Sequence, residues 1–172
     1  MKSEKNTIVL VRAVEPEDLE LLYKIENDFN LWDVGVTNVP YSKFMLHEYM
    51  SSITGDIYTD KQVRLMIENE DGKVVGIADI VDFNPSHRRA EIGIVIMKEY
   101  RKQGYASATL KYLKKYASHI LHLKQIYAIV PNSNEYSVCL FKKSGFESDA
   151  VLKNWLFDGE KYLDATLMQY FL

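Results

Sequence analysis

Apolar residues recur along the chain with two periods, one typical of helices and one typical of strands. The clearest helical pattern runs from Gly104 to Leu121, where apolar residues lie three and four positions apart and end at Ile120. Its lysines, Lys111, Lys114 and Lys115, are expected to face away from the apolar side. Further helical patterns start at Glu15-Pro16-Glu17-Asp18 and cover Ser42 to Ile53 and Asn134 to Ser144.

Short β-branched and apolar runs predict strands between these helices. They cover Ile8 to Val14, Gln62 to Glu68, Val74 to Phe83, Glu91 to Met97, Gln125 to Val130, Glu147 to Phe157 and Tyr162 to Phe171. Leu31 to Tyr41 has no period and is interpreted as a loop. The order β-α-α-β-β-β-α-β-α-β-β predicts an α+β fold with a mixed, largely antiparallel sheet flanked by helices. We expect a single domain over residues 1–172.

Composition and charge narrow the class of protein. The single cysteine, Cys139, suits a reducing compartment, and the start MKSEKNT resembles neither a signal peptide nor a membrane span, so we expect a cytoplasmic protein that does not bind a membrane. From Glu15 to Asp60 ten acidic and two basic residues give −8, whereas from Lys98 to Lys143 nine basic and two acidic residues give +7. One part should therefore attract cations and another anions. The pI of about 5.8 argues against nucleic acid as the partner of the lysine-rich helix.

The stretch from Arg88 to Ala106 combines a buried strand, a basic turn and a helix start. Free backbone N–H groups and the positive end of the helix dipole point at an anion in such a layout. The sequence therefore predicts a phosphate site at Arg101-Lys102-Gln103-Gly104-Tyr105-Ala106.

That motif resembles the acetyl-coenzyme A signature of the GNAT acetyltransferases, Arg/Gln-x-x-Gly-x-Gly/Ala. A second motif of the family matches Asn134 to Phe146, and the resemblance covers nearly the whole chain. Within the family, His87-Arg88-Arg89-Ala90-Glu91 is most similar to spermidine N-acetyltransferases, with ribosomal-protein N-terminal acetyltransferases close behind. The resemblance implies an enzyme that uses acetyl-CoA as co-substrate and needs no metal.

The resemblance also implies where the cofactor lies. The backbone of Ile94, Val95 and Ile96 would pair with the pantetheine arm like an added strand, which requires the sheet to part beside it. N–H groups of the turn would cradle the pyrophosphate, namely those of Arg101, Lys102, Gln103, Gly104, Tyr105, Ala106 and Ser107. Asn134 would bond the cofactor, Lys143 would reach its phosphate end, and Phe141 would contact it. Asn134 also fits a helix N-cap, and Lys143 also fits a solvated surface.

Acetyl transfer needs a neutral amine, and removing the proton of an alkylammonium costs roughly 4–5 kcal/mol at pH 7, against roughly 2 kcal/mol for releasing a thiolate. Glu91 is the candidate base because it begins the strand that carries the cofactor; an ion pair with Arg88 or Arg89 is the alternative. Many relatives have tyrosine as the acid where this chain has Phe141. Ser137, on the same helical face, is placed to orient a water instead. Cys139 is expected in the core on the opposite side.

The acidic segment favours a small cationic amine as the acceptor. Asp33 and one of Asp79 and Asp82, preferably Asp82, are the candidate contacts, together with Glu91. Spermidine acetyltransferases carry acids where this chain has Asn38 and Val39, which speaks against strict polyamine specificity. A protein N-terminus as acceptor, a non-catalytic acyl-CoA-binding module and a homo-oligomer are left open.

Overall fold

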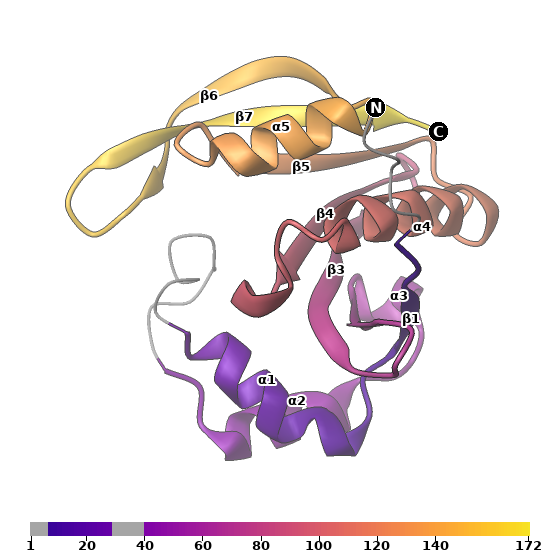
Figure 1. The fold of residues 1–172 in the computed structure, drawn as a ribbon. Coiled ribbons are helices and arrows are strands. Elements are labelled where there is room, and N and C mark those ends of the chain that lie inside the picture. Colours follow the sequence, from indigo (N-terminus) through magenta and orange to yellow (C-terminus); the bar gives the residue numbers. More distant parts are fainter. Residues whose placement is uncertain (1–6, 29–39) are drawn as a thin grey trace.

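The computed structural model describes residues 7–28 and 40–172, whose helices and strands are arranged as Figure 1 shows. Within these ranges the centre is a seven-stranded sheet in the order β1-β2-β3-β4-β5-β7-β6. Neighbouring strands are antiparallel except β4 and β5, which are parallel. The strands are β1 (Leu10–Ala13), β2 (Val63–Glu68), β3 (Val74–Asn84), β4 (Arg89–Ile96), β5 (Gln125–Pro131), β6 (Glu147–Phe157) and β7 (Tyr162–Phe171). The predicted α+β class and mixed sheet are confirmed.

The described residues form five α-helices, of which four lie in the predicted places. They are α1 (Leu19–Glu26), preceded by the 3₁₀ turn η1 (Pro16–Asp18), α2 (Lys43–Ser52), α3 (Ile57–Asp60), α4 (Tyr105–His119) and α5 (Glu135–Lys143). The one-turn helix α3 was not expected, since its residues show no helical period; the side chain of Asp56 starts it by accepting a hydrogen bond from the Tyr58 N–H. None of the described helices is long and apolar enough to cross a membrane.

Two apolar clusters hold the helices on opposite faces of the sheet. On one face, Leu22 and Ile25 of α1 and Leu46 of α2 pack with Met66 of β2 and Ile77 of β3. On the other face, residues of α4 and α5 pack with Ala78, Ile80, Ala90, Ile92, Ile126 and Ala128 of the central strands. Successive strand residues point to opposite faces, so the two clusters use alternate positions of the same strands.

The end of α4 differs from the prediction, and the turn between β2 and β3 is shaped by a side chain. Ile120 follows the last turn of α4 and is 62% exposed, so the apolar face ends at Ala117. In the turn between β2 and β3 only Gly72 has a positive φ, +73°, because the Asn69 side chain shapes the rest by accepting from the N–H groups of Asp71 and Lys73.

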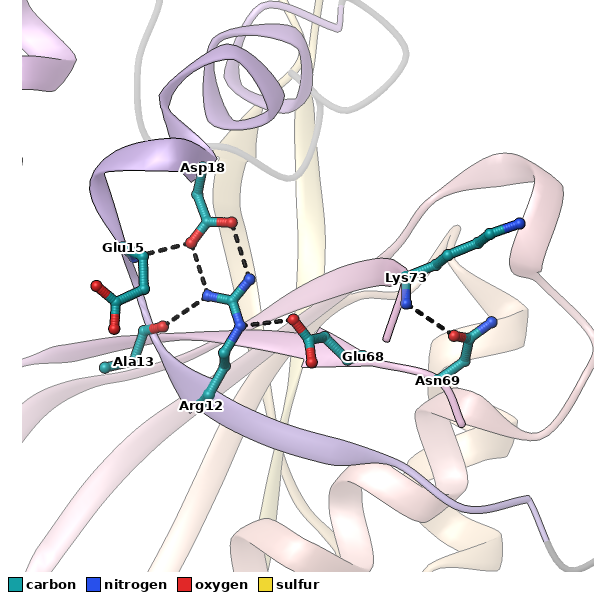
Figure 2. A network of polar contacts seen from close by, with 7 residues as sticks. All are labelled: Arg12, Ala13, Glu15, Asp18, Glu68, Asn69 and Lys73. Atoms are coloured by element: carbon teal, nitrogen blue, oxygen red, sulfur yellow. Dashed lines mark hydrogen bonds and ion pairs between the residues drawn. The ribbon is translucent and has the colours of Figure 1, made fainter. Parts of the chain in front are cut away.

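An ionic cluster ties the start of the chain to the sheet edge (Figure 2). The Arg12 guanidinium on β1 donates to both carboxylate oxygens of Asp18, at 2.7 and 2.9 Å, and to Glu68 Oε1 on β2 at 2.6 Å. Asp18 also accepts from the Glu15 N–H at 2.8 Å, which closes a capping box around η1. The Arg12 contact holds the pKa of the Asp18 carboxyl below its usual range. This cluster fixes the entry to α1.

Candidate active site

The parallel strands β4 and β5 stay together for only part of their length. Their register pairs Arg89 with Gln125, Ala90 with Ile126 and Glu91 with Tyr127, and ends there. Beyond Glu91, β4 continues to Ile96 paired with β3 alone among the described residues. The predicted parting of the sheet beside the central strand is therefore confirmed, and it begins at Glu91 and Tyr127.

Backbone hydrogen bonds show which groups of β4 face this opening. The Met97 N–H donates to the Val75 carbonyl on the β3 side, and the Arg88 carbonyl accepts from the Lys124 N–H on the β5 side. N–H and C=O groups alternate from side to side along a strand. The backbone groups of Ile94 and Ile96 therefore face the opening, and those of Val95 face β3.

The basic turn lies at the wide end of the opening, between β4 and α4. Gly104 is the N-cap of α4 with φ +92°, a backbone conformation that residues other than glycine adopt only at a cost in free energy. A Cβ there would lie 2.6 Å from Oγ1 of Thr7, which itself donates to the Gln103 carbonyl at 2.8 Å. Because the first N–H groups of a helix have no partner within it, the turn presents donors to an anion. The Arg101 Nε donates to the Ile96 carbonyl at 3.0 Å and fixes the turn against β4.

A cleft of about 390 Å³ lies between the first half of α4 and the end of α5. Its lining consists of Ser107, Lys111, Lys114, Lys143, Ser144, Gly145 and Tyr170. Lys111 and Lys143 are exposed there. The expectation that Lys114 faces away was wrong: its ammonium lies 3.9 Å from the centre of the Tyr170 ring and donates to the Ser144 carbonyl. Burial lowers its pKa. Three cations thus gather in one cleft beside the turn.

Helix α5 carries the residues of the second motif. The Asn134 side chain caps the helix by accepting from the Ser137 N–H at 3.1 Å. Phe141 is buried and packs edge-on against Phe146, with ring centres 4.9 Å apart. Cys139 is exposed, so its predicted core position was wrong: only one face of α5 is covered by the rest of the protein. Ser137 is half-buried in the first turn.

Two carboxylates and a phenol meet where the strands part. Ala90 and Ile92 are buried on the α4 face, so Glu91 between them points to the other face; Tyr127 on β5 does likewise. The Tyr127 hydroxyl donates to Oδ2 of Asp82 on β3. Burial, and next the charge of Asp82, raise the pKa of Glu91.

The remaining acidic candidates have other places. Asp79 accepts two hydrogen bonds from the Arg64 guanidinium, at 2.7 and 3.0 Å, and Arg64 also pairs with Glu26 of α1. The charge of Asp79 is thus paired with Arg64, and Asp82 is the remaining carboxylate of β3 near Glu91. Asp33, like Asn38 and Val39, lies outside the described residues.

The ion-pair alternative for Glu91 was wrong. Among the described residues Glu91 forms no ion pair, and Arg88 donates to the His122 carbonyl instead. In the same part of the chain no group of three or more His, Cys, Asp or Glu side chains could hold a metal.

Sequence reasoning missed Tyr127 and the inward position of Lys114. Tyr127 sits in an alternating strand, where an aromatic residue is unremarkable, and its partner Asp82 is 45 positions away. The sequence does contain one signal: Tyr127 lies between the apolar residues Ile126 and Ala128. Strand alternation therefore places its side chain on the same face as Glu91.

Comparison with known proteins decides the family. Residues 9–147 match the sequence model of the acetyltransferase (GNAT) domain. The chain belongs to the GNAT acetyltransferase family. It is therefore an acetyl-CoA-dependent acetyltransferase.

Individual relatives are more distant. Spermidine N(1)-acetyltransferase of Escherichia coli K12 is 29% identical over 163 residues, covering 95% of this chain and 86% of the relative. An N-alpha-acetyltransferase of Sulfurisphaera tokodaii is 26% identical over 141 residues, covering 76% of this GNAT chain and 77% of the relative. The crystal structure of Vibrio cholerae spermidine N-acetyltransferase in complex with CoA and spermine superposes with a TM-score of 0.84, at 26% identity and 95% coverage of both chains.

Proposed function

We propose that this acetyltransferase moves acetyl from acetyl-CoA to a primary amine of a small polycationic acceptor of the polyamine type. The observation that carries the proposal is the pair Asp82 and Glu91, two carboxylates without an ion-pair partner among the described residues, at the point where β4 and β5 part. A cationic acceptor supplies the positive charge that this pair lacks. The spermidine acetyltransferases among the relatives support the same acceptor class.

The donor would occupy the opening and the basic end of the molecule. Ile94 and Ile96 offer backbone groups to the amide groups of pantetheine, which is the pairing of an added strand. The N–H groups from Arg101 to Ser107 would hold the pyrophosphate at the start of α4. Asn134 would contact the arm from α5, and Lys143 would attract the phosphate end in the lysine-lined cleft.

The acceptor would approach from the face on which Glu91 lies. Asp82 would bind an ammonium of the acceptor, with Asp33 as a further proposed contact. Glu91 would take the proton from the attacking nitrogen, directly or through a water. Its raised pKa suits this role, because a base closer in pKa to the amine makes proton transfer less unfavourable.

The leaving thiolate would need less help than the amine. Releasing a thiolate costs only about 2 kcal/mol at pH 7. Phe141 has no proton to donate and is packed against Phe146. Ser137, on the half-buried first turn of α5, would orient a water that protonates the sulfur. A slow but complete reaction is therefore the expected outcome, rather than binding of acyl-CoA without turnover.

The experiment is a thiol-release assay with purified protein, acetyl-CoA and a panel of acceptors. The panel contains spermine, spermidine, putrescine, a monoamine and peptides with free N-termini, and mass spectrometry identifies the acetylated product. We expect acetylated polyamine, and a loss of about a hundredfold or more in kcat for Glu91→Gln. Glu160→Gln, an exposed glutamate in the β6–β7 turn, should match wild type. Acetylation of peptides alone would move the acceptor to protein N-termini, and no release with any amine would reject catalysis.

A further inference from the structure

Tyr127 makes a contact that crosses the central strand. It lies on β5, and its hydroxyl donates to Oδ2 of Asp82 on β3, with β4 between the two strands. Asp82 has φ +47° at an irregularity in the β3–β4 register, between Val81 and Asn84. A residue other than glycine in this conformation is strained, and an irregular register re-aims the side chain. The left-handed backbone conformation at Asp82 thus directs its carboxylate toward the Tyr127 hydroxyl.

The position of this contact coincides with the start of the opening. Glu91 and Tyr127 form the last pair of the β4–β5 ladder, and their side chains share a face. A molecule inserted between β4 and β5 from the basic turn reaches its deepest point at this pair. Its reacting end would therefore meet Glu91, Tyr127 and, through Tyr127, Asp82.

The phenol acts here as a fixed donor. Burial raises the pKa of Tyr127, the bond to Asp82 raises it further, and Arg89 lowers it less. The hydroxyl consequently stays protonated over the range in which an acetyltransferase works and is a poor acid for a thiolate. Arg89, two positions before Glu91 on β4, lies on the same face of the sheet. Arg64, Asp79 and Glu26 on that face are paired with one another.

We infer that Tyr127 is a positioning residue for acetyl transfer, whose hydroxyl holds the Asp82 carboxylate beside Glu91. This inference rests on the proposed function, in which Glu91 is the base and Asp82 binds the acceptor. Held in this way, Asp82 keeps one negative charge next to Glu91 and so maintains the strength of the base. Its second oxygen, Oδ1, is left to accept a hydrogen bond from the ammonium of the acceptor.

The kinetic test removes only the hydroxyl. Tyr127→Phe should lower kcat/KM for the polyamine about tenfold, leave KM for acetyl-CoA within about twofold, and move the acid limb of the pH profile to lower pH. The limb moves down because Asp82, once released, raises the pKa of Glu91 less. Asp82→Asn should reproduce the shift. Because Tyr127 acts through Asp82, the double variant should lose no more kcat/KM than Asp82→Asn alone. The control is Tyr112→Phe, on a ring that stacks with Tyr116 on α4.

A second measurement does not depend on turnover. The side-chain carboxyl of Glu91 is titrated by carbon-13 NMR in the full protein without substrates, and Glu91→Gln assigns its signal. Tyr127→Phe should move the Glu91 midpoint to lower pH. An unchanged midpoint overturns the inference whatever happens to kcat, and so does a variant that no longer folds. If wild type acetylates no amine, the proposed function fails while this titration still decides the role of Tyr127.

Discussion

At the scale of single residues, the turn before α4 depends on the absence of a side chain at Gly104. Two effects act there, the left-handed backbone at φ +92° and the approach of Thr7 Oγ1 to 2.6 Å from a Cβ. Gly159, in the β6–β7 turn, has φ +99° and nothing within 4 Å of its Cβ. The two glycines therefore separate backbone strain from steric contact.

Gly104→Ala should weaken both the fold and the binding of acetyl-CoA. We expect a loss of about 1–2 kcal/mol in the free energy of unfolding from strain, and a rise of about tenfold or more in KM for acetyl-CoA, because Thr7 or the turn must move. Gly159→Ala should lose similar stability and keep the wild-type KM. Urea unfolding and initial rates measure the two quantities. Equal KM values for both variants would show that the turn tolerates the methyl group.

The residues of the candidate site differ in how far the sequence alone could identify them. Gly104 follows from one continuous strand, turn and helix, so local pattern was enough to select it, whereas Glu91 was selected because the resemblance assigns the cofactor to its strand. Tyr127 depends on a contact with Asp82, whose side chain is aimed by an irregularity in strand pairing. Register and backbone strain arise from tertiary packing, and a period of apolar residues does not encode them.

At the scale of elements, periodicity predicted the order of helices and strands because each element buries one face. The hairpin of β6 and β7 was bounded correctly at Glu147–Phe157 and Tyr162–Phe171, since Asp158-Gly159 separates two β-rich runs. Helix α3 escaped prediction because one turn is too short to show a period. The parting of β4 and β5 was anticipated from the resemblance, whereas the residues at which it begins came from the register.

The cluster that joins β1, η1 and β2 gives an element-scale prediction about pH. Arg12→Ala should lower the free energy of unfolding by about 2 kcal/mol at pH 7, a typical value for charge-assisted hydrogen bonds. Because Arg12 lowers the pKa of Asp18 in the folded protein, its contribution is complete above the ordinary aspartate pKa of about 3.9 and is lost as pH falls through the folded pKa. The difference between variant and wild type should therefore shrink below about pH 4.

Chemical denaturation at a series of pH values measures this difference. The matched control is Lys43→Ala, which removes the pair of Lys43 with Glu20, whose side chains are 51% and 65% exposed. Such exposed pairs contribute about 0–1 kcal/mol, so this variant should stay close to wild type throughout. A loss for Arg12→Ala that is the same at pH 7 and pH 3 would show that packing of the arginine stem, rather than the ion pair, holds the cluster.

At the scale of the whole molecule, the charge asymmetry of the sequence separates α1 and α2 from α4 and α5, whereas α3 packs through Ile57 against the cluster of α4 and α5. The acidic segment from Glu15 to Asp60 contains α1, α2 and α3, and the basic segment from Lys98 to Lys143 contains α4 and α5 (Figure 1). The apolar clusters place α1 and α2 on one face of the sheet and α4 and α5 on the other. An anionic donor and a cationic acceptor would thus be drawn to different faces and meet at the parted strands.

Salt should weaken the binding of both substrates in proportion to their charge. Raising NaCl from about 50 to about 300 mM shortens the screening length from above 10 Å to about 6 Å. We expect KM to rise for acetyl-CoA and for the acceptor, more steeply for spermine than for putrescine. The value of kcat should stay within about twofold, because the protein shields the reacting groups from the salt. Steady-state rates with one substrate saturating measure each KM, and a monoamine acceptor serves as the control with the smallest slope. If salt leaves the KM for spermine unchanged, the acceptor is recognised by shape and hydrogen bonds rather than by acidic residues. Acceptors of low charge would then be favoured.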